Sequence, residues 1–250
     1  TLTAGVVSSL ITVEMQDAGG NPINTTTNRT ITLTKSSAGG VFRDAADTAN
    51  ITTIILPAGA SSTNYLYHDT VAGSPTITNA APGLTPATQT ETVKAAAAAM
   101  VRVETLANGA GTIVPAQSIT AGNSLTVYAI TRDAFSNFVA NVAADAWLLP
   151  TKTGGVGDGD LAPAGDSKSA VFTGHLTGTA TVRAASGALP PTDSGTLTVL
   201  PAFASKLVIT TGAQLLTAGV SSGVITVQLQ DTLGNPANNT SNRVITLTSS

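Results

Sequence analysis

Short stretches in which apolar and polar residues alternate recur along the whole chain. In residues 11–16, Ile11, Val13 and Met15 fall on one side and polar residues on the other. This period of two is that of a half-buried β-strand. The same reasoning predicts further strands at residues 30–35, 51–56, 63–67, 75–80, 89–94, 101–105, 124–132, 146–149, 169–173, 178–184 and 195–200.

Clusters of Gly, Pro, Asn and Asp separate these predicted strands, which fixes the fold class that we expect. Such residues favour turns, because Gly and Asn tolerate positive φ and Pro fixes its own φ. Many short strands separated by turns are typical of β-sandwiches with Greek-key connections. The pattern therefore predicts an all-β protein of tandem immunoglobulin-like sandwich domains.

The strongest signal in the sequence is an internal repeat. Residues 2–36 and 216–250 are identical at 23 of 35 positions, with a constant offset of 214. A shorter period lies inside it, since Thr-Ala-Gly at residues 3–5, 120–122 and 217–219 leads each time to a strand and then to Asp17, Asp133 or Asp231. The intervals between these aspartates, 116 and 98 residues, are each close to the size of one sandwich domain.

The repeat divides the chain into three parts. We name them domain A (residues 1–97), domain B (98–201) and segment A2 (202–250), the last being the first strands of a second copy of domain A. The strand predicted at 206–210 has no counterpart ahead of residue 3, so domain A lacks its first strand. We interpret the chain as a window on a longer periodic polymer. The alternative is a subunit whose incomplete ends complement each other by strand donation.

Composition excludes several classes of function. Only 10% of the residues are charged and the net charge is −3, so the chain lacks the basic surface that nucleic acid requires. No apolar run approaches the roughly 18 residues that span a bilayer, so we expect no membrane insertion within this segment. The chain has no cysteine, so its domains must hold together by packing and strand pairing alone.

A repeated turn motif follows the first strand of each part. Asp17-x-x-Gly20-Asn21-Pro22 recurs as Asp231-x-x-Gly234-Asn235-Pro236, and in weaker form from Asp133 to Asn137. An Asp carboxylate can accept hydrogen bonds from turn amides, which favours a structural turn. Calcium binding is the alternative, although Ca²⁺ needs six to eight oxygen ligands. We expect no cofactor; if calcium binds, the Gly-rich stretch 157–160 supplies the candidate ligands Asp158 and Asp160, with Asp166 nearby.

The order of these motifs resembles a known family. Thr-Ala-Gly, then Ile-Thr-Val, then Asp-x-x-Gly-Asn-Pro, with Leu56-Pro57-Ala58-Gly59 downstream, resembles bacterial immunoglobulin-like repeats of the invasin and intimin type. The resemblance covers nearly the whole chain and implies a fold, with surface display, adhesion or spacing as the function. It supplies no catalytic residues.

Catalytic chemistry has little support in the sequence. His68 and His175 stand in contexts that predict strands, without a neighbouring nucleophile motif, and no hydrolase elbow, metalloprotease motif or phosphate loop occurs. We therefore expect no enzyme. Trp147, the only tryptophan, is most simply a core residue of domain B, and an exposed sugar-stacking face is the alternative.

The two linkers are short, which favours neighbouring domains held end to end. We expect assembly contacts at the A–B linker, with Ala95 and Met100, and at the B–A2 linker, with Leu200, Pro201, Phe203 and Lys206. The partners that we expect are copies of the same unit in a tandem array or filament. The sequence thus predicts a structural repeat of an extracellular, cell-surface fibre, stalk or coat of a bacterium.

Two rival functions stay open at this point. One is an adhesin module that binds a glycan or a cell-surface partner. The other is an accessory domain of a secreted polysaccharide-degrading enzyme.

Overall fold

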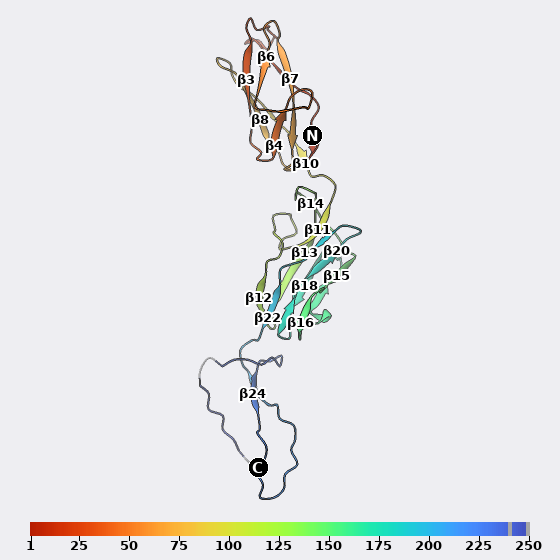
Figure 1. The fold of residues 1–250 in the computed structure, drawn as a ribbon, viewed down its shortest axis with the longest axis vertical. Coiled ribbons are helices and arrows are strands. Elements are labelled where there is room, and N and C mark those ends of the chain that lie inside the picture. Colours follow the sequence, from red (N-terminus) through yellow and green to blue (C-terminus); the bar gives the residue numbers. More distant parts are fainter. Residues whose placement is uncertain (240–241, 249–250) are drawn as a thin grey trace. The chain divides into compact units, whose positions relative to one another are not determined.

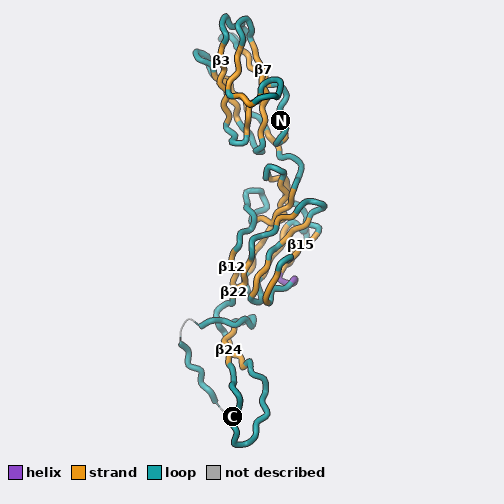
Figure 2. Tube along the Cα trace, viewed as in Figure 1, coloured by secondary structure: helices purple, strands orange, loops and turns teal. Residues whose placement is uncertain are grey.

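The computed structural model describes residues 1–239 and 242–248, so residues 240–241 and 249–250 of segment A2 lie outside the description. The chain divides into two compact units, one formed by residues 1–99 and 131–140, the other by residues 100–130 and 141–250. Strands make up nearly all the regular structure, as Figures 1 and 2 show. Among the described residues the one helix is the 3₁₀ turn η1 (Asp158–Asp160), and none is long and apolar enough to cross a membrane.

Two four-stranded sheets build the first unit. One has the order β2-β7-β4-β5, from strands β2 (Ile11–Glu14), β7 (Ser62–Asp69), β4 (Gly40–Arg43) and β5 (Asn50–Ile51). The other has the order β6-β3-β8-β9, from strands β6 (Thr53–Leu56), β3 (Arg29–Lys35), β8 (Thr76–Ala80) and β9 (Ala87–Thr90). A short parallel pair joins β1 (Leu2–Thr3) to β10 (Val93–Lys94). Most chain connections cross from one sheet to the other, as in a Greek-key sandwich.

The core of this sandwich comes from both sheets. Tyr65 and Tyr67 of β7 are completely buried, and Phe42 of β4 packs between them with ring centroids 5.6 and 5.4 Å away. Leu33 and Ile77 face them from the other sheet. Burying a large apolar side chain contributes about 1.5–3 kcal/mol to the free energy of unfolding. These buried rings and aliphatic chains therefore stabilise the unit without a disulfide.

The second unit contains a larger sandwich. One sheet has the order β17-β18-β13-β11-β21, from strands β11 (Met100–Glu104), β13 (Ser124–Arg132), β17 (Leu161–Pro163), β18 (Ser169–Thr173) and β21 (Pro191–Thr192). The last two residues of β13 belong to the first unit, as does most of β14 (Phe138–Asn141), which pairs with β13. The facing sheet has the order β12-β22-β19-β16, from β12 (Gln117–Thr120), β22 (Leu197–Leu200), β19 (Gly178–Ala180) and β16 (Lys152–Gly154). A third, two-stranded sheet pairs β15 (Ala146–Leu148) with β20 (Arg183–Ala185). Val101, Val103, Val127, Phe172 and Leu197 are completely buried in the core between them.

Segment A2 contributes one antiparallel pair to the described structure, β23 (Lys206–Ile209) with β24 (Val227–Gln230). Its large apolar side chains stay mostly exposed: Leu247 is 84% exposed, whereas Leu33, the equivalent residue of domain A, is 4% exposed. The strands that cover Leu33 in domain A, β6 and β8, have no counterpart within residues 202–250.

The predicted all-β sandwich fold is confirmed, but three predicted strands are each two strands. Residues 51–56 split into β5 and β6, residues 89–94 into β9 and β10, and residues 178–184 into β19 and β20, and the two halves lie in different sheets each time. A chain that changes sheet after two to four residues keeps its apolar side chains toward the same core from opposite sides. The alternation pattern does not reveal the change. Strands β1, β4, β12, β14, β16, β17 and β21 were missed, because two to four residues are too few to show a period.

Candidate functional site

The three Asp-x-x-x-Asn turns share one local geometry. We name them the A turn (17–21), the B turn (133–137) and the A2 turn (231–235). In each turn the first carboxylate oxygen, Oδ1, accepts two backbone N–H groups: those of residues 19 and 21 at 2.9 Å in the A turn, those of residues 135 and 137 at 2.9 and 2.8 Å in the B turn, and those of residues 233 and 235 at 2.9 and 2.8 Å in the A2 turn. The fourth residue has positive φ, +83° at Gly20, +70° at Ser136 and +96° at Gly234. The structural-turn interpretation is confirmed.

The second carboxylate oxygen reaches beyond the turn in two of the three cases. Within the first unit, Asp133 Oδ2 accepts the backbone N–H of Ala96 at 2.9 Å. Within the second unit, Asp231 Oδ2 accepts the backbone N–H of Ala202 at 3.0 Å. Ala96 and Ala202 both belong to linkers, so each carboxylate ties a turn to the linker that precedes it.

The asparagine at the end of the turn holds a second piece of backbone. In the first unit, Asn137 Nδ2 donates to the carbonyl of Thr70 at 2.8 Å, and its Oδ1 accepts the N–H of Ala72 at 2.9 Å. In the second unit, Asn235 Nδ2 donates to the carbonyl of His175 at 2.9 Å, and its Oδ1 accepts the N–H of Thr177 at 2.7 Å. A carboxamide has one donor side and one acceptor side, so it fits a C=O and an N–H two residues apart.

A strand contact completes the arrangement. The N–H of Ala99 donates to the carbonyl of Arg132 at 2.8 Å, and the N–H of Ser205 donates to the carbonyl of Gln230 at 2.8 Å. Each amide lies three residues after the one that the carboxylate holds. We call the turn's Asp and Asn, together with the linker and loop backbone that they bind, the clasp. Both clasps have the same spacing: four residues from Asp to Asn, two between the loop groups that Asn binds, and three between the two linker amides.

Burial distinguishes the clasped turns from the A turn. Asp133 and Asp231 are 0% exposed and Asn235 is 2% exposed, whereas Asp17 and Asn21 are exposed. Burial raises the pKa of Asp133, but hydrogen bonds from the Asn137 side chain and from the turn and linker amides outweigh it, so its pKa lies below the ordinary Asp value of 3.8. The pKa of Asp231 is lowered by the same balance. Both clasps therefore depend on a charged carboxylate.

The pKa of Asp17 is also lowered, chiefly by the hydrogen bond from the backbone N–H of Asn21. Its Oδ2 accepts a hydrogen bond from the Asn21 side chain at 3.1 Å. The A turn thus has the internal bonds of a clasp without the outer ones.

The calcium candidates do not come together. Asp158 pairs with Lys152, Asp160 pairs with His175 at 2.5 Å between Oδ1 and Nδ1, and Asp166 accepts the N–H of Lys168 at 3.0 Å. Nowhere in residues 1–239 and 242–248 do three or more acidic or histidine side chains form a group that could hold a metal. Each carboxylate has a separate local partner, so the geometry does not favour calcium at residues 157–166.

The two histidines stand apart from each other. His68 lies on β7, as predicted, beside an open surface hollow that Arg43 and Asp47 also line, and those two residues form an ion pair of 2.7 Å. The prediction of a strand at His175 was wrong, because this residue lies in the loop between β18 and β19. Its backbone carbonyl is the one that Asn235 holds.

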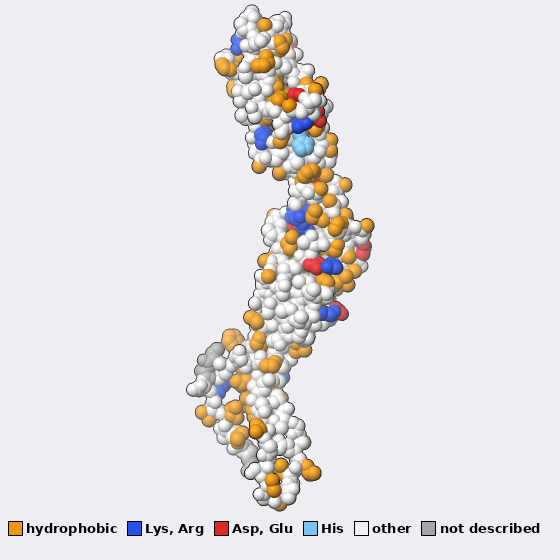
Figure 3. Space-filling model, in the orientation of Figure 1, with side chains coloured by type: hydrophobic (Ala, Val, Ile, Leu, Met, Phe, Trp, Pro, Cys, Tyr) orange, Lys and Arg blue, Asp and Glu red, His pale blue; other side chains and the backbone are white. Residues whose placement is uncertain are grey.

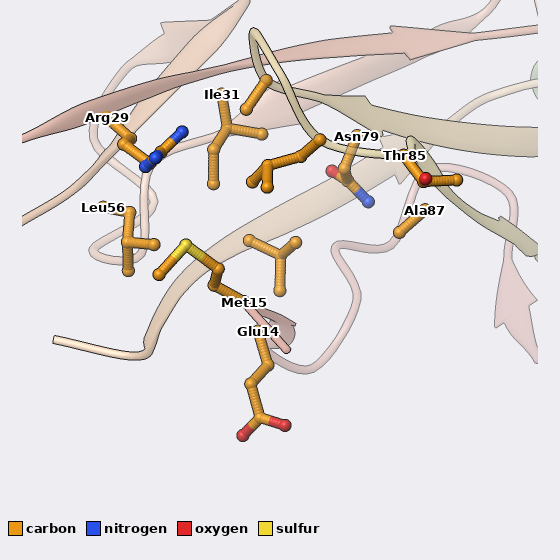
Figure 4. Close-up of a pocket in the computed structure, with 11 residues that line it drawn as sticks. Glu14, Met15, Arg29, Ile31, Leu56, Asn79, Thr85 and Ala87 are labelled. Carbon is orange, nitrogen blue, oxygen red and sulfur yellow. The ribbon is translucent and has the colours of Figure 1, made fainter. Parts of the chain in front are cut away.

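Trp147 packs partly buried against the core of domain B, and its indole N–H donates to the carbonyl of Ser167 at 3.0 Å. The ring therefore packs at the edge of the core, as the core interpretation predicts, and sugar stacking by its exposed part stays an untested alternative. A pocket of about 60 Å³ lies in the first unit, lined by Met15, Leu56 and Asn79 among others, and Figure 4 shows the Glu14 carboxylate directed away from it. Pockets that bind small molecules are usually about 300–1,000 Å³.

The residues predicted for assembly lie on or beside the linkers. Ala95 precedes the amide that Asp133 holds, and Met100 begins β11. Leu200 ends β22, Pro201 precedes the amide that Asp231 holds, and Lys206 begins β23. Phe203 is 94% exposed. Whether these side chains mediate assembly stays a prediction.

Comparisons with known proteins give a likeness of fold alone. No family model and no curated protein matches the chain. Among solved structures it resembles FdeC, an Escherichia coli adhesin (20% identity over 94% of this chain and 72% of that one, TM-score 0.42), and InvD of Yersinia pseudotuberculosis (17%, 94% and 69%, TM-score 0.33). It also resembles domains 4–9 of the surface layer protein SbsC (17% identity over 94% of this chain, TM-score 0.28), and it spans 36% of that structure's length.

The sequence pointed to the turns but not to what they bind. Thr70, Ala72, His175 and Thr177 take part through backbone groups only, and any residue type except proline can supply an N–H. The one usable signal was the recurrence of Asn four residues after Asp in all three turns, including the B turn, where Gly and Pro are lost.

Proposed function

We propose that this chain is a structural, non-catalytic repeat of a bacterial extracellular fibre, stalk or coat, in which the clasps restrain successive repeats against each other. The observation that carries the proposal is that one clasp, with the same atoms and spacing, occurs at both linkers. A repeat that serves as building material needs a joint that does not depend on the neighbour's side chains. The clasp binds backbone groups, so the B turn can bind the linker and loop of domain A, and the A2 turn can bind those of domain B, although the side chains differ.

The surface supports the same proposal. Only 10% of the residues are charged, and charged side chains are few on the face shown in Figure 3. Within the described residues no group of acidic or histidine side chains is arranged for metal chemistry. An extracellular structural role requires stability, and the two buried cores supply it.

Two measurements test the function. Antibodies against this chain are expected to label intact source cells, and chains of one, two and four 214-residue units are expected to increase in contour length in proportion to their number in electron micrographs. Labelling only after cell lysis, or compact particles whose length does not grow with the number of units, would refute the proposal. Specific binding on a glycan array would instead support the adhesin-module alternative.

A further inference from the structure

The A turn has every group of a clasp, yet in the described residues it binds nothing outside itself. The Asn21 side chain donates only to Asp17. Asp231 and Asn235 occupy the same positions one period of 214 residues later, and they hold Ala202, His175 and Thr177. Identical chemistry at equivalent positions is thus occupied in one copy and open in the other.

A strand edge that pairs with no other described strand adjoins the open turn. Strand β2 is the last strand of the sheet β2-β7-β4-β5, and β7 covers one of its edges. The equivalent strands have a partner on the opposite edge: β24 pairs with β23 in segment A2, and β13 lies between β18 and β11 in domain B. An uncovered edge presents unpaired N–H and C=O groups and is a template for another strand.

The register of a strand docked on this edge can be taken from segment A2. There Lys206 lies opposite Gln230 and Leu207 opposite Leu229. Subtracting the period of 214 residues places a second copy of Lys206 opposite Gln16, and one of Leu207 opposite Met15.

The side chains of such a strand would meet an apolar surface. The equivalents of Leu207 and Ile209 in domain B are Val101 and Val103, which are completely buried in its core. Val13 and Met15, which face the core of the first unit, line the pocket of about 60 Å³. Residues directly opposite each other on paired strands point to the same face of the sheet. Leu207 opposite Met15 and Ile209 opposite Val13 would therefore point to that side.

We propose that the A turn and the free edge of β2 together form a docking site for a second copy of the end of domain B. This copy supplies the backbone of residues 175–177 to Asn21, the linker amide of Ala202 to Asp17, and residues 206–209 as a strand beside β2. The inference rests on the proposed function, because it takes the clasp to be the joint between repeats. It goes further by naming the partner, the register and the residues that the A turn binds.

The test uses this chain extended at its amino end by a second copy of residues 98–214, which continues the period. The sequence has no cysteine, so spin labels can be placed at single introduced cysteines. The first pair of labels is placed at the added copy of Ala162 and at Ala18, and the matched second pair at the original Ala162 and at Thr232. All three of these residues are exposed. Distances are measured by pulsed electron paramagnetic resonance on samples that light scattering shows to be monomeric.

We expect both pairs to give the same narrow distance distribution. Asn21→Ala should broaden the distribution of the first pair alone, and Asn235→Ala that of the second pair alone. The amides of Thr12, Glu14 and Gln16, which point toward the free edge, should exchange with solvent at least about tenfold more slowly in the extended chain.

The possible failures are distinct. A broad first distribution beside a narrow second one, or a first distribution that Asn21→Ala leaves unchanged, would overturn this inference while the proposed function stands. Two broad distributions would overturn both, since the clasp of segment A2 would then restrain nothing.

Discussion

The buried carboxylate of Asp133 is expected to stabilise the first unit more than the exposed carboxylate of Asp17 does, because Asp133 also holds the linker amide of Ala96. Asp133 is 0% exposed and accepts four hydrogen bonds, two at Oδ1 from the turn and two at Oδ2 from Asn137 Nδ2 and the N–H of Ala96. In Asp133→Asn one oxygen becomes an NH₂ group. If the turn keeps its acceptor, the two donors that faced Oδ2 lose theirs.

The magnitude follows from those two bonds. A hydrogen bond to a charged group contributes about 1.5–3 kcal/mol net, and partial relaxation of the turn reduces the sum to about 3 kcal/mol. With about 1.4 kcal/mol for each factor of ten, the local opening that exposes the Ala96 amide should become roughly 150-fold more frequent. Asp17→Asn is the matched control, because Asp17 makes the same turn bonds but is exposed and holds no linker amide.

Amide hydrogen exchange followed by NMR is the suitable assay, since a chain with two compact units need not unfold in one step. We expect the protection of the Ala96 and Ala72 amides to fall strongly in Asp133→Asn, and amides in and around the A turn to change little in Asp17→Asn. Equal and small changes in both variants would refute the reasoning, because they would show that the outer bonds of the clasp contribute nothing.

Three further predictions concern acid, glycine and tryptophan. The folded pKa values of Asp133 and Asp231 lie below 3.8, so the stability that these carboxylates contribute is complete above that pH and is lost as the pH falls below it. Hydrogen exchange of the Ala96 and Ala202 amides, corrected for intrinsic rates, should therefore be faster at pH 3 than at pH 6. Unchanged protection would contradict a charged clasp. Gly5 and Gly20 both have positive φ, but a Cβ on Gly5 would lie 2.5 Å from the Phe135 ring, whereas a Cβ on Gly20 would contact nothing. In thermal unfolding of the first unit, Gly20→Ala should therefore lower the stability by about 1 kcal/mol and Gly5→Ala by about 2–3 kcal/mol. Equal losses would show that the Phe135 ring moves away freely. In urea unfolding, Trp147→Ala should destabilise the second unit by about 2–4 kcal/mol, whereas Leu148→Ala, at the exposed neighbour, should destabilise it by less than about 0.5 kcal/mol. The reverse order would show that the Trp147 ring contributes little to the core.

The sequence alone determined the fold class and the local form of the turns. Ile11, Val13 and Met15 alternate with polar residues in the sequence, and the structure buries them more than their neighbours. An Asp followed by a residue of positive φ and an Asn is a local arrangement, so the turn could be predicted from five residues. The 214-residue repeat also needs no structure.

Only the tertiary structure decided where strands end and what the turns hold. Residues 51–56 look like one strand, but Ile51 belongs to one sheet and Leu56 to the other, and this depends on the partners that each half finds. Asn21 and Asn235 have the same sequence context, yet one is exposed and the other buried. The difference lies in the backbone of residues 175–177 and 202, some 30–60 positions away, because a hydrogen bond to backbone leaves no trace in the identity of the residue that supplies it.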